Sequence, residues 1–135
     1  MPGWGPGSFE NDDAQEWLTT LASLGVDDLQ VPLVRAADND AYMETAESSV
    51  AIAAAEAVAA LKQVPSPVLP KEIAEWVGRV TSQTTNTAIP EFAALAARAV
   101  QRIRTNSELK DLWLEADGLN EWSANLRDLE TRLAG

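Results

Sequence analysis

Residues 50–61, with the sequence V-A-I-A-A-A-E-A-V-A-A-L, decide the fold of this chain. Every residue in this stretch except Glu56 is apolar, so a helix formed here can expose little of its surface to water. The small alanine side chains allow other helices to approach it closely. We therefore predict a central helix over about 44–63, with the rest of the chain packed around it.

Six further segments show apolar residues at the three- and four-residue spacing of amphipathic helices. One helix is expected over 12–24, and three more are expected to begin near Val31, Pro70 and Pro90. A short helix should follow the capping residue Ser107, and the last should run from Leu119 after a break at Gly118. Asn11 or Asp12 is expected to cap the first of them. Residues 64–70 contain three prolines and are predicted to form a linker, and the threonine-rich residues 82–88 a polar loop.

The expected fold is therefore all-α. No segment alternates with the two-residue period of a strand. We predict one domain over residues 1–135, built as a compact bundle of about six to seven short helices with an ordered amino-terminal coil over 1–10. No basic or apolar leader is visible at the start, and the apolar run 50–61 is too short to span a bilayer. We expect a cytoplasmic protein that does not bind membranes.

The composition excludes several kinds of chemistry. The 135 residues contain no Cys and no His, so thiolate metal sites, disulfides and catalysis that uses a histidine base are impossible. The formal net charge is -11. Residues 1–60 hold eleven acidic residues against one basic residue, Arg35, a net charge of -10 for that half. A field of this sign repels phosphate backbones, so we expect no nucleic-acid partner, and we predict neither a cofactor nor a metal.

The amino-terminal sequence W-G-P-G-S-F-E-N-D-D-A-Q-E-W, residues 4–17, closely resembles a signature of the bacterial family of domain of unknown function 4259. The positions that match it are Trp4, Gly5, Gly7, Phe9, Asn11, Asp12, Ala14 and Trp17. The stretch 107–113, Trp122 and the pair Arg132-Leu133 are similar to the family's carboxy-terminal end. The resemblance spans nearly the whole chain, and it implies no established activity.

The motif has a structural interpretation at each position. Gly5 and Gly7 are expected to adopt backbone angles closed to other residues, which lets Trp4 and Phe9 fold back onto the first helix. Asn11 and Asp12 satisfy free N–H groups at the start of that helix. We predict that Trp4→Ala lowers stability by roughly 3–5 kcal/mol if the ring is buried.

A functional interpretation of the same region is an acidic rim. It consists of Glu10, Asn11, Asp12 and Asp13, next to an aromatic patch. Such a rim suits a basic protein surface. Our first hypothesis for function is accordingly a non-enzymatic interaction module of the immunity or regulatory type, with no catalytic residues and a basic protein as its partner.

An alternative hypothesis is a magnesium-dependent hydrolase similar to the all-helical nucleotide pyrophosphohydrolases. Its carboxylates would be Glu44, Glu47, Glu72 and Glu75, which form two E-x-x-E pairs on two predicted helices. Oxygen ligands suit Mg²⁺, but no basic or glycine-rich phosphate site accompanies the pairs. This hypothesis requires that the four carboxylates converge in one cleft.

Two further sets of charged residues are notable. Glu56 lies alone within the apolar run, and a carboxylate there is expected to be partly exposed or paired with an arginine such as Arg98. Arg98, Arg102 and Arg104 form a small basic cluster near the end of the fifth predicted helix, where cations suit the helix dipole.

Overall fold

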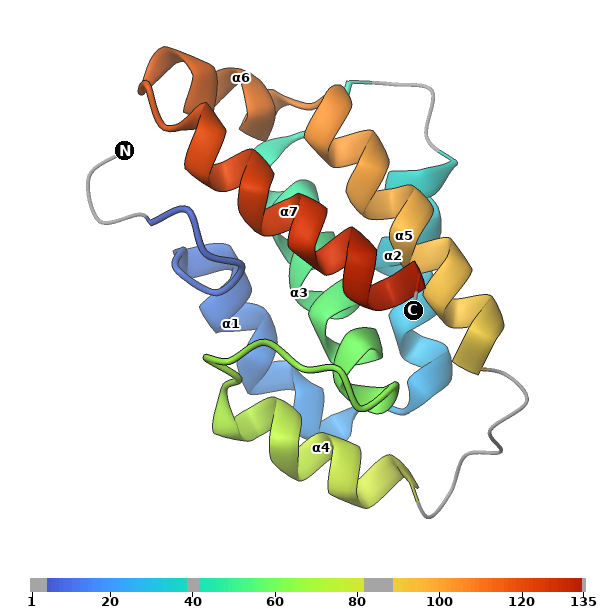
Figure 1. Ribbon diagram of the computed structural model, residues 1–135. Coiled ribbons are helices and arrows are strands. Elements are labelled where there is room, and N and C mark those ends of the chain that lie inside the picture. Colours follow the sequence, from blue (N-terminus) through green and yellow to red (C-terminus); the bar gives the residue numbers. More distant parts are fainter. Residues whose placement is uncertain (1–4, 39–41, 82–88, 135) are drawn as a thin grey trace.

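The α3 helix, Thr45–Leu61, occupies the centre of the computed structural model and contacts every other α-helix (Figure 1). The structure describes residues 5–38, 42–81 and 89–134. Every side chain from Ala51 to Leu61 is buried, including that of Glu56. The prediction of a central helix is confirmed, and the helix ends at Leu61, two residues before the expected boundary.

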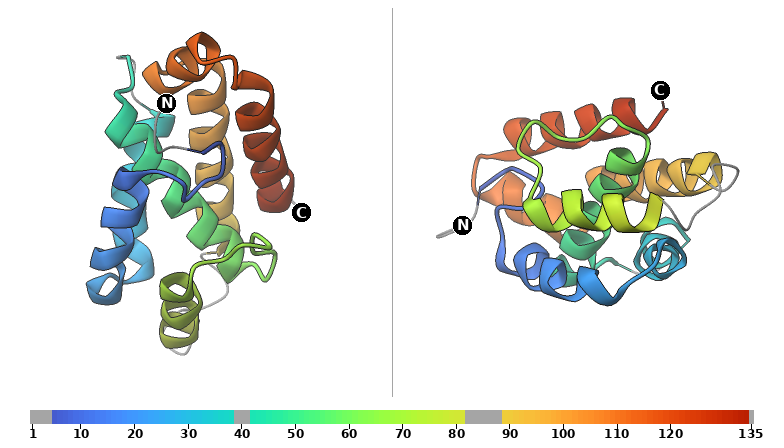
Figure 2. Two further views of the ribbon diagram at one scale, coloured as in Figure 1. Left: turned by 90° about the vertical axis from the view of Figure 1, so that its left-hand side faces the viewer. Right: turned by 90° about the horizontal axis from the view of Figure 1, so that it is seen from below.

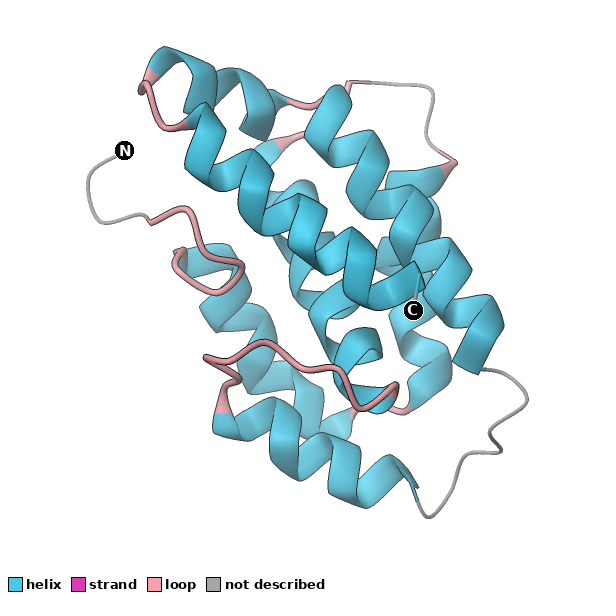
Figure 3. Cartoon of the chain, viewed as in Figure 1, coloured by secondary structure: helices cyan, strands magenta, loops and turns pink. Residues whose placement is uncertain are grey.

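The other helices surround α3 in layers. They are α1 (Asp12–Thr20), α2 (Gln30–Ala37), α4 (Lys71–Thr81), α5 (Ile89–Thr105), α6 (Glu108–Glu115) and α7 (Leu119–Ala134), with the short 3-10 helices η1 (Leu21–Ser23) and η2 (Val26–Leu29) between α1 and α2. Seen from below in Figure 2, α7 lies on one side of α3, and the run from α1 to α2 lines the opposite side. The described residues contain only helices and loops, as Figure 3 shows, so the all-α prediction is confirmed.

Two predicted caps are present. Asn11 accepts the backbone N–H of Ala14 through its Oδ1 at 2.8 Å, and Ser107 accepts that of Lys110 through its Oγ at 3.0 Å. These side chains satisfy donors that the first helical turn leaves free. At the other end of α6, Asp117 rather than Gly118 adopts the left-handed conformation, with φ 60. Gly118 instead leaves room for the indole of Trp113, because a Cβ there would lie 2.5 Å from its Cε3 atom.

The first two predicted helices differ from the structure in detail. The expected helix over 12–24 is α-helical only to Thr20 and continues as the 3-10 helix η1. This end is held by α4, since the Trp76 Nε1 and a guanidinium nitrogen of Arg79 both donate to the carbonyl of Leu24, at 2.9 and 2.7 Å. The chain then turns into η2 before α2, earlier than the predicted start near Val31.

The linker over 64–70 is present as predicted. The predicted loop over 82–88 lies outside the described residues. None of the helices in the described ranges combines the length and the apolar character that crossing a membrane requires.

Candidate functional site

Residues 5–10 form a closed loop in front of α1. The N–H of Gly5 donates to the carbonyl of Glu10 at 3.0 Å, and the N–H of Glu10 donates to the carbonyl of Gly7 at 3.2 Å. The Glu10 carboxylate also accepts the N–H of Gly7 at 2.9 Å. Within this loop Phe9 is buried in the core, and its carbonyl accepts a hydrogen bond from the Gln15 side chain at 2.7 Å. The described part of the coil is thus ordered and packed on the bundle, as predicted.

The two motif glycines have a different purpose from the one expected. Neither Gly5 nor Gly7 adopts a left-handed φ, so that expectation is wrong. A Cβ on either residue would lie 2.4 Å from a carboxylate oxygen of Glu10. The glycines thus leave room for this carboxylate, which folds back over the loop; as the end of a flexible, exposed side chain, it can move aside for a Cβ at low cost. Trp4, the residue on which the structural interpretation most depended, lies outside the described residues.

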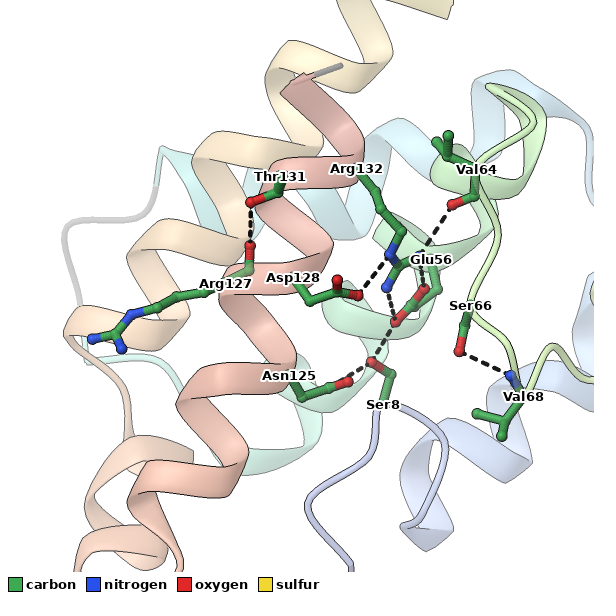
Figure 4. Close-up of polar contacts among 10 residues, drawn as sticks. All are labelled: Ser8, Glu56, Val64, Ser66, Val68, Asn125, Arg127, Asp128, Thr131 and Arg132. Atoms are coloured by element: carbon green, nitrogen blue, oxygen red, sulfur yellow. Dashed lines mark hydrogen bonds and ion pairs between the residues drawn. The ribbon is translucent and has the colours of Figure 1, made fainter.

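A buried polar network connects this loop to α3 and α7 (Figure 4). Glu56 is 1% exposed, and its Oε2 accepts the hydroxyl of Ser8 at 2.6 Å. Ser8 in turn accepts the side-chain amide of Asn125 at 3.0 Å. Arg132 donates to both oxygens of Glu56, at 2.9 and 3.2 Å. A buried carboxylate is costly unless it is paired and hydrogen-bonded, and here both conditions are met.

Arg132 is itself held by three groups. Besides Glu56 it contacts Asp128, at 2.9 Å from Nε, and the carbonyl of Val64, at 3.2 Å. Burial lowers the pKa of Arg132, but the hydrogen bonds and charges of Glu56 and then Asp128 outweigh burial and raise it. The network therefore joins the amino-terminal loop, α3, the linker after α3 and α7 around one ion pair.

Glu56 pairs with an arginine, as expected, but that arginine is Arg132 and not Arg98, and the carboxylate is buried rather than partly exposed. Arg98 lies on the surface and pairs with Asp38 at 3.1 Å. The other two arginines of the basic cluster also have partners, since Arg104 pairs with Glu130 at 2.6 Å and Arg102 donates to the carbonyl of Asn106 at 3.3 Å. Sequence reasoning selected an arginine on a neighbouring helix, but the rotation of α5 about its axis directs Arg98 to solvent.

A small hollow of about 10 Å³ lies beside Ser8, where the amino-terminal motif meets the carboxy-terminal helices. Its lining includes the motif residues Gly5, Gly7 and Asn11, the amide of Asn125, and Trp113 and Trp122. This volume suits about one water molecule. The two segments that resemble the family signature are thus in contact with each other, and they enclose a packed junction rather than a substrate cleft.

The structure does not bring the four glutamates of the hydrolase hypothesis together. Glu44 and Glu47 lie at the start of α3, beside α6, while Glu72 and Glu75 lie on α4, which packs near the other end of α3 (Figure 1). Across the described ranges no group of three or more carboxylates is arranged to hold a metal ion.

The acidic rim divides into two kinds of residue. Glu10 and Asn11 use their side chains on backbone N–H groups of the loop and of α1. Asp12 and Asp13 lie on the first turn of α1 with neither a hydrogen bond nor an ion pair to the described residues. Glu16, which the sequence pattern did not single out, is exposed one turn further along α1 and is equally unpaired within the described part of the chain.

Ser8 and Asn125 were not predicted from the sequence to belong to the buried network. Ser8 occupies a variable position of the signature, and Asn125 lies 117 residues away along the chain. The isolated carboxylate of Glu56 was the available signal that a buried polar partner exists. It did not indicate which residues supply that partner.

Comparison with known proteins agrees with the motif. The chain belongs to a family described as domain of unknown function (DUF4259), whose model matches residues 3–125. Arg132, the cation of the buried ion pair, lies beyond the matched segment. Neither the curated proteins nor the solved structures contain a match to the chain.

Proposed function

We propose that this protein is a binding module whose α1 side contacts a basic surface of another protein. The observation that carries the proposal is the state of the carboxylates over residues 5–38. This segment has seven acidic residues and one arginine, and Asp38 alone among the seven forms an ion pair with another described residue. Unpaired carboxylates on one side of a protein create a potential that attracts cationic surfaces.

The arrangement of the helices adds to this charge imbalance. The inner face of α1 is buried through Ala14 and Leu18, so its acidic residues Asp12, Asp13 and Glu16 lie toward the outside. The run from α1 through η2 to α2 forms one side of the molecule in Figure 2, and Asp27 and Asp28 extend the acidic character along it. This side offers a broad surface to a partner rather than a single deep cleft.

Binding of this kind depends on ionic strength. Complementary charges mainly increase the association rate and select the partner, and salt screens exposed charges over about 8–10 Å at physiological concentration. We therefore expect the affinity for a basic protein to fall as salt is added.

The test is retention of proteins from a cell lysate on the immobilised chain at low and at high salt. The informative variant is Asp12→Asn/Asp13→Asn/Glu16→Gln, which removes three negative charges from α1. A matched control is Glu75→Gln/Glu115→Gln/Glu121→Gln, which removes the same charge from exposed positions of α4, α6 and α7. We expect the first variant to lose a salt-sensitive basic protein that the second retains. The proposal is contradicted if both variants retain the basic protein equally, or if its retention does not change with salt concentration.

A further inference from the structure

A groove of about 280 Å³ lies between the start of α2 and the start of α5. Its lining comes from two separate parts of the chain: Asp27 and Gln30 from η2 and α2, and Glu91, Phe92 and Leu95 from α5. Phe92 and Leu95 are half-buried and pack against the core, so one part of the groove is apolar. The groove therefore combines a firm apolar wall with two carboxylates that approach from different helices.

The two carboxylates of the groove are unpaired. Asp27 and Glu91 are exposed, and neither forms a hydrogen bond or an ion pair with the described residues. The neighbouring Asp28 differs, because it accepts the backbone N–H of Gly25 at 2.7 Å. Of the neighbours Asp27 and Asp28, Asp27 is thus the one whose carboxylate has no hydrogen bond to the described backbone.

The cations of the flanking helices are directed elsewhere. Arg98 on α5 pairs with Asp38, and Arg104 pairs with Glu130. Arg35 on α2 lines a different hollow, which it shares with Glu47. The amino terminus of α5 contributes roughly half a positive charge, which leaves two carboxylates in clear excess. The groove is therefore complementary to a cation that the described residues do not provide.

The shape of the groove selects the kind of cation. A bare metal ion requires several oxygen ligands, whereas Phe92 and Leu95 offer hydrocarbon. An arginine side chain has an aliphatic stem for the apolar wall, and its planar guanidinium has five N–H donors that can bridge two carboxylates. It also binds favourably to an aromatic face such as that of Phe92.

We infer that the groove between η2 and α5 receives one arginine side chain of a basic partner protein. This inference rests on the proposed function and adds to it the position and chemistry of one specific contact. The acidic side formed by α1 then attracts the partner, and the groove selects an arginine on it.

The test is an NMR titration of the full chain with N-acetyl-arginine amide, followed through backbone amide shifts. N-acetyl-citrulline amide serves as the control ligand, because it has nearly the same shape without the charge. We expect saturable shifts around Gln30, Phe92 and Leu95 with the arginine ligand, and much smaller ones with the citrulline ligand. The variant Asp27→Asn/Glu91→Gln should weaken binding roughly 2- to 30-fold, the range expected for two exposed charge pairs.

A charge-matched variant, Asp12→Asn/Glu16→Gln, separates this inference from the broader proposal, because it changes α1 and leaves the groove intact. It should bind the arginine ligand within about twofold of the parent. Equal binding of the citrulline ligand overturns the inference, and so does undiminished binding by Asp27→Asn/Glu91→Gln. If the arginine ligand does not bind the groove, but neutralising α1 still abolishes retention of the basic protein from the lysate, only the inference about the groove is refuted. If the arginine ligand binds the groove saturably, but retention from the lysate does not depend on the charge of α1, the inference about the groove is supported and the proposal of a broader acidic surface is refuted.

Discussion

Glu56 on α3 and Asp12 on α1 have the same carboxylate group in opposite surroundings. Glu56 is 1% exposed and accepts hydrogen bonds from Ser8 and, through both oxygens, from Arg132. Asp12 is exposed and has no partner among the described residues. The difference indicates which charges hold the fold together and which remain available to another molecule. Net charge alone does not make this distinction, since both residues contribute equally to it.

The largest expected effect is on the buried side of the comparison. Arg132→Ala leaves the Glu56 carboxylate buried without a cation. Because Arg132 retains 14% exposure, we expect a loss of about 3 kcal/mol in the free energy of unfolding, the lower end of the range for a broken buried ion pair. Urea denaturation followed by circular dichroism measures it. The double variant Glu56→Leu/Arg132→Met should recover much of the loss, and a double variant that is no more stable than the single one would show that packing, not charge, dominates.

A smaller effect is expected at Ser8. Ser8→Ala removes the hydroxyl that donates to Glu56 and accepts from Asn125, but the ion pair with Arg132 remains. The expected cost is about 1–2 kcal/mol, because the buried carboxylate of Glu56 and the half-buried amide of Asn125 each lose one partner. Denaturation of this variant beside Arg132→Ala ranks the two contributions. A cost equal to that of Arg132→Ala would mean that Ser8 and the ion pair act as one unit.

An intermediate case is the exposed pair formed by Tyr42 and Asp111. The Tyr42 hydroxyl donates to the Asp111 carboxylate, and chiefly this hydrogen bond raises the pKa of Tyr42 from 10.0 to about 12. The folded state therefore keeps its proton more tightly than the unfolded state, so this contribution to stability is complete below pH 10 and is lost as the pH rises towards 12. Absorbance titration is direct because the chain has one tyrosine. Asp111→Asn should return the pKa close to 10; an unchanged pKa would assign the shift to another cause.

The smallest effect is expected on α1. Asp12→Asn/Glu16→Gln removes two exposed charges that have no partner within the described residues, so the free energy of unfolding should change by less than about 1 kcal/mol. Thermal denaturation at low salt measures this change in stability. A loss comparable to that of Arg132→Ala would place these carboxylates among the groups that stabilise the fold and would remove the basis for their availability to a partner.

The helices were largely predictable because each is encoded locally. The apolar run of α3, the caps Asn11 and Ser107, and the proline-rich linker are all recognisable within a few residues of sequence. The errors concern how elements face one another. Glu56 signalled a buried partner, but the choice between Arg98 and Arg132 depends on the rotation and register of two helices, which a single amphipathic pattern does not determine.

The candidate binding surface was predictable only in part, for a related reason. Adjacent residues in the acidic rim were treated as equivalent, whereas Glu10 and Asn11 bind backbone N–H groups and only Asp12 and Asp13 remain unpaired within the described chain. The groove that includes Asp27 and Glu91 was not foreseen, because it forms only when α2 and α5 pack together. Composition revealed the excess of acid, and tertiary structure determines where it is accessible.

The span of the Glu56 network also has a consequence for the order of folding. Its side chains come from residues 8, 56, 125, 128 and 132, so the network cannot form until α7 has been synthesised. Contacts between residues so distant in sequence require the closure of long loops and tend to form late. During translation the Glu56 carboxylate therefore has no arginine partner until α7 has been made. We expect the loop over 5–10, although synthesised early, to become ordered late. We expect native-state hydrogen exchange to show this loop opening together with α7.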